Sequence, residues 1–569
     1  MAHDAVMLKY ISISTCHMQR RNCALTDCDA KSCYDRVLPH ILSLCYSKLG
    51  LPASTCRWLS RALVNMKYHV QTSHGVSQGI SQSDKDGMVF GVGQGATDAP
   101  TGWLFISAFL SHLYDSEANG SFLYDPQDLV KLAWSHVLFV DDAYLFHTAP
   151  QLDVTERQLQ AIVQHDVSRW NNGLDISGGK LEATKSSYYT LLWSFHPDGQ
   201  PYLDDTSHQT HNPVYIDTAG NREFLQYISP IQHSSEYKSL GVRMPGDLSN
   251  DYELQAIRVK CDRFAAFLTA CPLTPQEAYI AYNVYFLPSL TYGALSLSLP
   301  KSTIDNIHKR YIPALLPKLG FQATFPRAIV YAPKSVGGLG ILPLNLLIVQ
   351  RKIKFIYRQL RLQSDLSKAL LINFRWANLQ AGQRAPLFTH NQTIAYIEND
   401  WVIQLHSELA QISGKLLLTD LPSGSLQREN DEFLMDMFIQ HYSNPIILKR
   451  LNYCRMYLRV SRLSDITTND GYTIQLGYYN GTQINQYSTQ HWPRQQRPSD
   501  KVWKLWQGAL NVAVGNNRRL RHPLRSWMKV DCSPTYWYHL SQQTVIQIQC
   551  SKWLQSPVHQ RRRTIYLAD

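Results

Sequence analysis

The sequence has few of the features that mark secreted or membrane-bound proteins. No stretch approaches the ~18 consecutive apolar residues of a membrane span, and the start lacks the basic segment and long apolar core of a signal peptide. The eleven cysteines include no CxxC pair and no Cys/His cluster at zinc spacing. We therefore expect a soluble, intracellular protein with reduced cysteines, without a disulfide framework or a zinc knuckle.

Internal repeats and low-complexity segments are also missing, so nothing indicates a solenoid or a biased, disordered chain. The 569 residues are enough for several hydrophobic cores, about three or four domains by length alone. The net charge of +11 favours a polyanionic partner such as nucleic acid. Basic clusters at 518–522 and 561–563 are consistent with such a partner. The tryptophans near the first cluster either stack on bases or belong to a hydrophobic core; they are Trp503, Trp506 and Trp527.

Two adjacent carboxylates, Asp141 and Asp142, stand between apolar residues in the run HVLFVDDAYLF at 136–146. This pattern predicts two short buried strands joined by a tight turn, with the acids at its tip. Two anions at one turn repel each other unless a divalent cation lies between them and another acid, and Mg²⁺ prefers such oxygen ligands. Asp also bonds to its own backbone in ordinary turns, so the pair alone leaves a plain turn open.

A second acid, Asp29, follows the short apolar segment ALTDC at 24–28. Leu38, Ile41, Leu42, Cys45 and Leu49 then recur at helical spacing, with Pro39 near the start and Gly50 past the end. We therefore expect Asp29 at the carboxyl end of a strand that leads toward a helix. Asp27 faces the same side of that strand, because strand side chains alternate with a period of two.

A glycine-rich stretch lies between these acids, from 90 to 103, and an apolar helix is expected from Trp103 to Leu113. Glycines let a backbone come close to a ligand, and the amide of Gln94 can touch a nucleotide without adding charge.

Taken in order, DAKSCYD (29–35), GVGQGATDAP (91–100) and FVDD (139–142) resemble the A, B and C motifs of the reverse transcriptases of non-LTR retrotransposons. Lys185 in the run GGKLEATKS (178–186) looks like the D motif of that family, and YKSLGV (237–242), with Leu240 and Gly241, looks like its E motif, the primer grip. LPSLTYG (287–293) and GGLGI (337–341) are similar to segments that follow the polymerase core. The resemblance covers roughly residues 5 to 345.

The resemblance implies an RNA-directed DNA polymerase that adds dNTPs to a primer 3′-hydroxyl on an RNA template. Two Mg²⁺ ions, or Mn²⁺ in their place, are implied as cofactors. Asp29 and Asp141 match the direct metal ligands, and Asp142 supports the primer-side metal. The spacing to Tyr34 favours Asp29 over Asp27.

Four further residues receive roles from the resemblance. Tyr34 lies against the sugar of the incoming nucleotide and excludes a 2′-hydroxyl by sterics, unless it is a core tyrosine. Gln94 and Gly95 contact the template or the nucleotide. Lys185 donates a proton to the leaving pyrophosphate, unless it is a solvated lysine; Lys180 competes with it for the register.

The expected fold class is α+β: a right-hand polymerase palm, with an antiparallel sheet and packed helices, over residues 1–245. A helical thumb or connection is expected at 246–340, and a mainly α-helical region of unknown role at 341–569. Only 28 residues precede Asp29, so the fingers strands that hold the triphosphate in this family have no counterpart. An inactive retroelement remnant that binds nucleic acid therefore stays open. A third alternative is another palm enzyme, such as a nucleotide cyclase. The glycine-rich loop and the primer-grip segment argue against it, because such an enzyme would need neither. The family also implies the nucleus.

Local sequence patterns also predict several helices and where they begin or end. The run DVTE at 153–156 has the pattern of a capping box for a helix that carries Leu159, Ile162, Val163, Val167 and Trp170 and ends before Gly173. A stripe of Leu254, Ile257, Cys261, Phe264 and Leu268 predicts a later helix, and Thr274 with Glu277 caps the next one. An N-terminal helix is expected from Val6 to about Met18.

Overall fold

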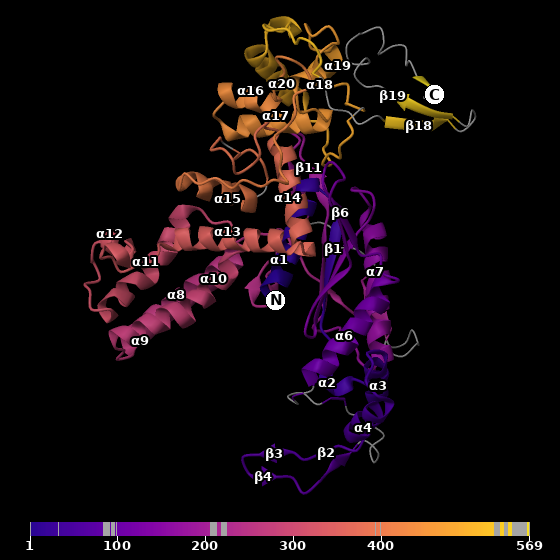
Figure 1. Ribbon diagram of the computed structural model, residues 1–569, viewed down its shortest axis with the longest axis vertical. Coiled ribbons are helices and arrows are strands. Elements are labelled where there is room, and N and C mark those ends of the chain that lie inside the picture. The colour runs from indigo at the N-terminus through magenta and orange to yellow at the C-terminus, as the bar shows by residue number, and fades with distance from the viewer. Residues whose placement is uncertain are drawn as a thin grey trace.

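The computed structural model describes residues 2–31, 33–82, 91–92, 97, 99–204, 213–217, 225–392, 394–398, 400–486, 488–528, 535–539, 544–548 and 566–567. The fold mixes helices with a small sheet. Figure 1 shows the sheet beside α1, a bundle of helices from α8 to α13 on one side of it, α7 on the other, and α16 to α20 at one end of the molecule.

The main sheet has five strands in the order β15-β10-β1-β9-β8. Its neighbouring strands run antiparallel except at one edge, where β10 and β15 are parallel, so the prediction of an antiparallel sheet is wrong for that pair. The parallel pair is short, at two residues of each strand, and forms because the chain returns to this edge after the segment between β10 and β15. The strands are β1 (Cys23–Cys28), β8 (His136–Phe139), β9 (Asp142–Thr148), β10 (Ser187–Leu191) and β15 (Ser229–Pro230).

Strand β1 is buried along its whole length. Because side chains alternate along a strand, Cys23 and Leu25 join the core that contains α1, whereas Ala24 and Cys28 join the core that contains α7. The sheet is therefore covered on both faces around β1.

Helices α6 (Ala99–Asp115) and α7 (Glu156–Ser177) belong to the second of these cores. The capping box of α7 joins Thr155 to Gln158, and Gly178 ends the helix with φ of 90°, so the boundaries expected at 153–156 and Gly173 are wrong. Thr155 is the residue in extended conformation whose hydroxyl reaches the third helical amide. Gly173 stays inside the helix, where it lies close to the Leu110 side chain of α6.

Helix α1 (Ala2–Gln19) confirms the expected N-terminal helix. It is buried nearly all round, including several polar residues, and packs against α14 (Asp365–Ala381). Asn373 Nδ2 donates to Ser14 Oγ at 3.1 Å and to Thr15 Oγ1 at 3.2 Å. The first helix and a helix more than 340 residues later thus share one core.

The helical bundle beside the sheet confirms the stripe predicted for α8, because all five of its residues are buried. The predicted box of Thr274 and Glu277 caps α9. The elements are α8 (Asp251–Ala270), α9 (Pro275–Ile280), a π-helix (Ala281–Phe286), α10 (Leu287–Ala294), α11 (Lys301–Lys318), α12 (Arg327–Tyr331), a 3₁₀ turn (Lys334–Val336) and α13 (Leu344–Leu362).

The region after 341 is largely helical as expected, and a small three-stranded sheet that was not expected follows it. Trp503 and Trp506 are 2% and 0% exposed, so they belong to the core and cannot stack on bases. Residues 561–563 lie outside the described residues. The further elements are α15 (Asp400–Gln411), α16 (Leu434–His441), α17 (Pro445–Leu458), α18 (Leu463–Ile466), α19 (Leu476–Tyr479), α20 (Asp500–Ala513), a 3₁₀ turn (Asn516–Arg518), β18 (Thr535–His539), β19 (Thr544–Ile548) and β20 (Tyr566–Leu567).

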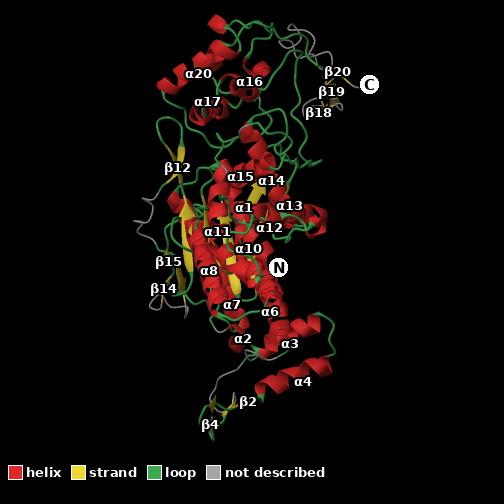
Figure 2. Cartoon of the chain, turned by 90° about the vertical axis from the view of Figure 1, so that its left-hand side faces the viewer, coloured by secondary structure: helices red, strands yellow, loops and turns green. Residues whose placement is uncertain are grey.

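Short helices and two-stranded ribbons complete the fold. Both views place α3, α4 and the ribbons of β2 to β5 at the end of the molecule opposite α20 (Figures 1 and 2). Across the described residues no helix combines the length and apolar character needed to cross a membrane. These elements are α2 (Cys33–Arg36), α3 (Pro39–Lys48), α4 (Ala53–Val64), β2 (Lys67–Tyr68), β3 (Gln71–Thr72), β4 (Gly75–Val76), β5 (Ser81–Gln82), β6 (Ser121–Tyr124), β7 (Lys131–Trp134), β11 (Trp193–Phe195), β12 (Pro201–Leu203), β13 (Tyr215–Asp217), β14 (Leu225–Tyr227), β16 (Lys238–Ser239) and β17 (Val242–Arg243).

Helix α3 agrees with its sequence signals, since Pro39 is its first residue and Gly50 follows its end with φ of 93°. Leu42 is buried, but Leu49 is 56% exposed, so the expected apolar stripe covers less of the helix than predicted.

The buried ring of His17 makes the stability of this fold sensitive to acid. Its Nε2 lies 3.0 Å from the Gly246 carbonyl oxygen. Burial lowers the pKa of His17 from 6.5 to about 4; the Gly246 contact opposes this shift and His233 adds to it. The neutral ring therefore contributes stability above pH 6.5 that is lost as pH falls toward 4.

We expect the free energy of unfolding in urea to fall by about 2 kcal/mol more between pH 7.5 and pH 5.0 in the wild-type chain than in His17→Gln. The glutamine cannot titrate, so the difference isolates the contribution of His17. His112→Gln, which removes an exposed histidine, is the matched control. The same pH dependence in His17→Gln as in the wild type would contradict this assignment.

Candidate active site

Three carboxylates meet at one end of the main sheet, where β1 ends and where the turn between β8 and β9 lies. Strands β8 and β9 form the predicted hairpin: Phe139 pairs with Asp142, and Val140 and Asp141 make the turn between them. In the ladder of β1 and β9, Cys28 pairs with Ala143, so the next residue, Asp29, comes opposite Asp142. The strand that ends in Asp29 and the hairpin that carries the other two acids are therefore direct neighbours.

The three acids act on one another electrostatically. Burial raises the pKa of the Asp29 carboxyl; Lys185 lowers it in part, and Asp141 and Glu182 raise it further. Burial also raises the pKa of Asp142, with Asp141 and Asp29 adding to the shift. The charge of Asp141 therefore makes both Asp29 and Asp142 harder to ionise, which is the behaviour of like charges in one site.

The donor chemistry fits Mg²⁺, because hard cations prefer carboxylate oxygens and the mutual repulsion of the acids is relieved by a cation. A finished ligand cage is not formed, however. Among the residues that the structure describes, no group of three or more His, Cys, Asp or Glu side chains is arranged to hold a metal ion.

Asp27 is bound by Lys9 and is not one of the three acids of this group. Its Oδ1 accepts a hydrogen bond from Lys9 Nζ at 2.9 Å, and both side chains are almost fully buried. The Lys9 ammonium also lies 4.5 Å from the ring centroids of Tyr144 and Tyr237. Burial lowers the pKa of Lys9 and raises that of Asp27, and each residue opposes the shift of the other. The choice between Asp27 and Asp29 therefore falls on Asp29, whose side chain is 34% exposed.

The turn that carries Asp141 is strained. Val140 has φ of 59°, a left-handed conformation that is costly for a β-branched residue. The Trp103 indole of α6 donates a hydrogen bond to the Val140 carbonyl oxygen and holds the turn in place. Strain of this kind persists where the surroundings fix it, often at functional sites.

Tyr34 lies beside this turn. Its ring centroid is 6.0 Å from that of Trp103. Burial raises the pKa of Tyr34, and Cys33 and Asp141 add to the shift, which places its hydroxyl within the field of the acids.

The glycine-rich stretch begins against the backbone of Tyr34. The Val92 amide donates to the Tyr34 carbonyl at 2.9 Å, and a Cβ on Gly91 would stand 2.0 Å from the same oxygen, so only glycine fits there. Gln94 and Gly95 themselves lie outside the described residues, so their predicted contacts stay predictions.

Lys185 lies beside Asp29. Its Nζ is 3.8 Å from Asp29 Oδ2, which favours it over Lys180 for the expected register. The backbone supports this position, because the Glu182 amide donates to the Asp29 carbonyl at 2.8 Å and the Asp29 amide donates to Ser186 Oγ at 3.1 Å.

The expected primer-grip segment forms a hairpin of β16 and β17. Leu240 and Gly241 make its turn with φ of 48° and 88°, and Tyr292 Oη donates to the Leu240 carbonyl at 2.9 Å. Burial raises the pKa of Tyr144, which lies two residues after Asp142, and the neighbouring Ser239 and Leu240 backbone oppose this shift. This hairpin therefore adjoins the strand that carries the acids.

Sequence reasoning missed two charged neighbours of the site. Lys9 lies on α1, whose sequence predicts only a buried helix. No local pattern in the sequence links Lys9 to Asp27. Glu182 pairs with Lys31 at 3.2 Å and faces Asp29; its place in the turn before Lys185 was the only available signal.

Comparison with known proteins adds little. No family model matches the chain, and no curated protein does. Among solved structures, a telomerase from Candida albicans, in complex with a fragment of telomeric RNA, matches with a TM-score of 0.29 and 11% sequence identity. That match covers 66% of this chain and 52% of the telomerase chain, so this chain spans about half the length of that protein.

Removing one partner of the buried pair behind the site tests its contribution to stability. We expect Lys9→Met to lower the free energy of unfolding by about 3 to 5 kcal/mol, because Asp27 is left buried without a counter-charge. The double variant Lys9→Met, Asp27→Leu should recover most of that loss, since no unpaired charge remains. Urea denaturation monitored by circular dichroism measures both. A double variant no more stable than Lys9→Met would contradict the pairing.

Proposed function

We propose that the chain is a reverse transcriptase of the non-LTR retrotransposon type, an RNA-directed DNA polymerase that adds dNTPs to a primer 3′-hydroxyl. The observation that carries this proposal is the meeting of Asp29 with Asp141 and Asp142 at the ends of adjacent antiparallel strands. Tyr34 and Lys185 border the same acids, in keeping with the roles that the sequence motifs give them. An RNA template, a DNA primer and dNTPs are the proposed partners.

In this proposal residues 1–245 are the palm, 246–340 are the thumb, and 341–569 are a C-terminal region. The bundle of α8 to α11 stands directly after the primer-grip hairpin in the chain and beside the sheet (Figure 1), where a thumb would reach a duplex bound over the acids.

Asp29 and Asp141 would hold two Mg²⁺ ions, or Mn²⁺ in their place, with Asp142 in support. Bound there, the ions would supply positive charge to the triphosphate and lower the pKa of the primer hydroxyl. The protein residues do the remaining work. Tyr34 excludes a 2′-hydroxyl, Gln94 and Gly95 contact the template or nucleotide, and Lys185 holds a proton for the pyrophosphate. The backbone of Leu240 and Gly241 supports the primer.

A catalytically inactive protein that binds nucleic acid with the same fold is the second candidate. The observation that favours it is the net charge of +11, which supports binding to nucleic acid whether or not the chain catalyses a reaction. Primer extension separates the two candidates.

Purified protein with poly(rA), oligo(dT), dTTP and Mg²⁺ should extend the primer. We expect Asp141→Ala to reduce the extension rate at least about a thousandfold, because several kcal/mol of charge stabilisation are lost. Asp365→Ala removes an exposed carboxylate in α14 that pairs with Lys368 one turn later, and should extend at the wild-type rate. No extension by the wild-type chain with Mg²⁺ or Mn²⁺ would reject the polymerase and leave the second candidate.

Tyr34 provides a test of sugar selection. We expect Tyr34→Ala to lower the preference for dTTP over UTP by about 10- to 100-fold, because the ring no longer blocks the 2′-hydroxyl. Tyr34→Phe keeps the ring and should keep the preference. The ratio of kcat/KM for the two nucleotides measures the effect, and an unchanged ratio in Tyr34→Ala would place Tyr34 in the core instead.

A further inference from the structure

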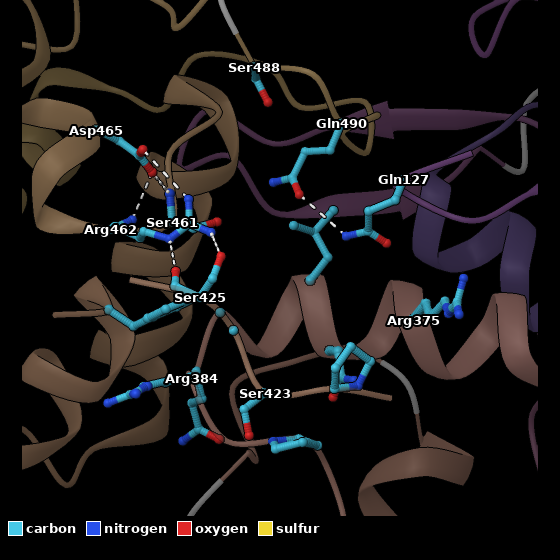
Figure 3. A pocket seen from close by; sticks show the side chains of 18 of the residues that line it. Gln127, Arg375, Arg384, Ser423, Ser425, Ser461, Arg462, Asp465, Ser488 and Gln490 are labelled. Atoms are coloured by element: carbon cyan, nitrogen blue, oxygen red, sulfur yellow. Dashed lines mark hydrogen bonds and ion pairs between the residues drawn. The ribbon is translucent and has the colours of Figure 1, made fainter. Parts of the chain in front are cut away.

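A polar pocket of about 660 Å³ lies in the C-terminal part of the chain, built from segments that contain none of the candidate catalytic residues. Its walls come mainly from the end of α14 and the loop after it, the segment 421–427, the junction of α17 and α18, and residues 485 and 488–492, and the loop between β6 and β7 adds Gln127 and Leu129. Figure 3 shows Arg384 and Ser423 on one side, with Gln127 and Gln490 across from them.

The charge of the lining is strongly positive. Four arginines and one acid, Asp465, line the pocket. Arg375 pairs with Asp125, and Arg462 donates to the Ser425 carbonyl at 2.6 Å and lies 4.0 Å from Asp465.

The other two lining arginines are Arg384 and Arg459. Among the described residues, neither guanidinium forms an ion pair within 4.0 Å or a hydrogen bond. The Asp436 carboxylate accepts a hydrogen bond from the Arg384 backbone amide at 2.9 Å and interacts with the Arg384 charge from a greater distance. Both arginine side chains are exposed. Two arginines thus present unused donors to the same pocket, and a guanidinium is well matched to phosphate oxygens.

The backbone at Arg459 is unusual for an arginine. It is the C-cap of α17 and has φ of 59°, where glycine or asparagine would be less strained. An arginine nevertheless occupies this strained position, and its side chain adds a positive charge to the pocket.

The walls are held together by buried bonds. The Arg455 guanidinium donates to the carbonyls of Leu379 at 2.7 Å and Gln380 at 3.1 Å, which joins the end of α17 to the end of α14. A Cβ on Gly382 would stand 2.6 Å from Arg455 Cζ, so only glycine lets these segments approach. The pocket is therefore formed before any ligand binds, which lowers the entropic cost of binding.

The rest of the lining suits a nucleoside. Hydroxyls of serines and amides such as Gln127 and Gln490 can donate to and accept from sugars and base edges. The Trp492 ring forms part of the wall, with Arg455 packed 5.6 Å from its centroid. The volume lies within the range of small-molecule sites and exceeds what an inorganic anion needs.

We propose that this pocket binds a nucleoside phosphate unit, with the phosphate on Arg384 and Arg459. The unit comes either from a free nucleotide or from a single strand of nucleic acid that lies across the pocket. This site is independent of the proposed polymerase activity, because it shares no residue with the acids.

Binding to the full chain tests the proposal in EDTA, where divalent ions are absent from the candidate active site. The probes are adenosine 5′-monophosphate by calorimetry and fluorescently labelled oligo(rA) of eight nucleotides by anisotropy. The double variant Arg384→Gln, Arg459→Asn removes both charges and keeps a residue that tolerates the left-handed backbone. We expect it to weaken binding of at least one probe tenfold or more.

The double variant Lys501→Gln, Lys504→Gln is the matched control. It removes two exposed charges from α20, in the same part of the chain but outside the pocket, and should change either affinity less than twofold. Loss of monophosphate binding identifies a free nucleotide as sufficient, whereas loss of oligo(rA) binding alone identifies a strand. Equal effects of the two double variants, or no binding of either probe to the wild-type chain, would overturn the proposal.

Photolabelling gives a second readout that does not depend on variants. The 8-azido derivative of adenosine monophosphate should label peptides within 127–129, 375–386, 421–427, 459–465 or 485–492. Labels confined to other segments would also overturn the proposal.

Discussion

The candidate site depends on how strand β1 is held. It is hydrogen-bonded to β9 on one edge and to β10 on the other, and side chains from its two faces enter two separate cores. A slip of one residue in either ladder would exchange those faces, so the register is strongly fixed. This constraint brings Asp29 opposite Asp142. The acids repel one another, and the packing of β1 keeps them together at one end of the sheet.

The same strand joins distant parts of the chain. Asp27 binds Lys9 of α1, and α1 packs against α14, so the rear of the site is built from the first residues and from the C-terminal half. Other buried charged side chains lie in the helices of the C-terminal half. Lys352 Nζ of α13 lies 3.1 Å from Glu408 Oε1, and Arg455 is buried where it joins α14 to α17. Removal of one partner at these positions is costly. The C-terminal helices therefore form part of the scaffold behind the acids, and the arginine-lined pocket lies within that scaffold.

Much of the local structure follows from sequence patterns. The strand before Asp29, the hairpin with Asp141 at its tip, the stripe of α8 and the cap at Thr274 are where the residues predict them, because burial and capping are short-range signals. The end of α7 was misplaced, since Gly173 is tolerated inside a helix where it packs closely against α6. The parallel pairing of β15, the buried pair of Lys9 and Asp27, and the pocket around Arg459 are long-range. No local pattern specifies which distant segment supplies a partner, so these features became visible only in three dimensions.

The binding of divalent ions by the three carboxylates is the central claim, and Mn²⁺ titration followed by electron paramagnetic resonance tests it most directly. The wild-type chain should bind Mn²⁺ at a site that Asp29→Asn weakens at least about tenfold, since one of the proposed ligands loses its charge. Asp365→Asn, in the exposed pair on α14, should leave the titration unchanged. Unaltered Mn²⁺ binding in Asp29→Asn would contradict the account, because Asp29 would then not belong with Asp141 and Asp142 to one metal site.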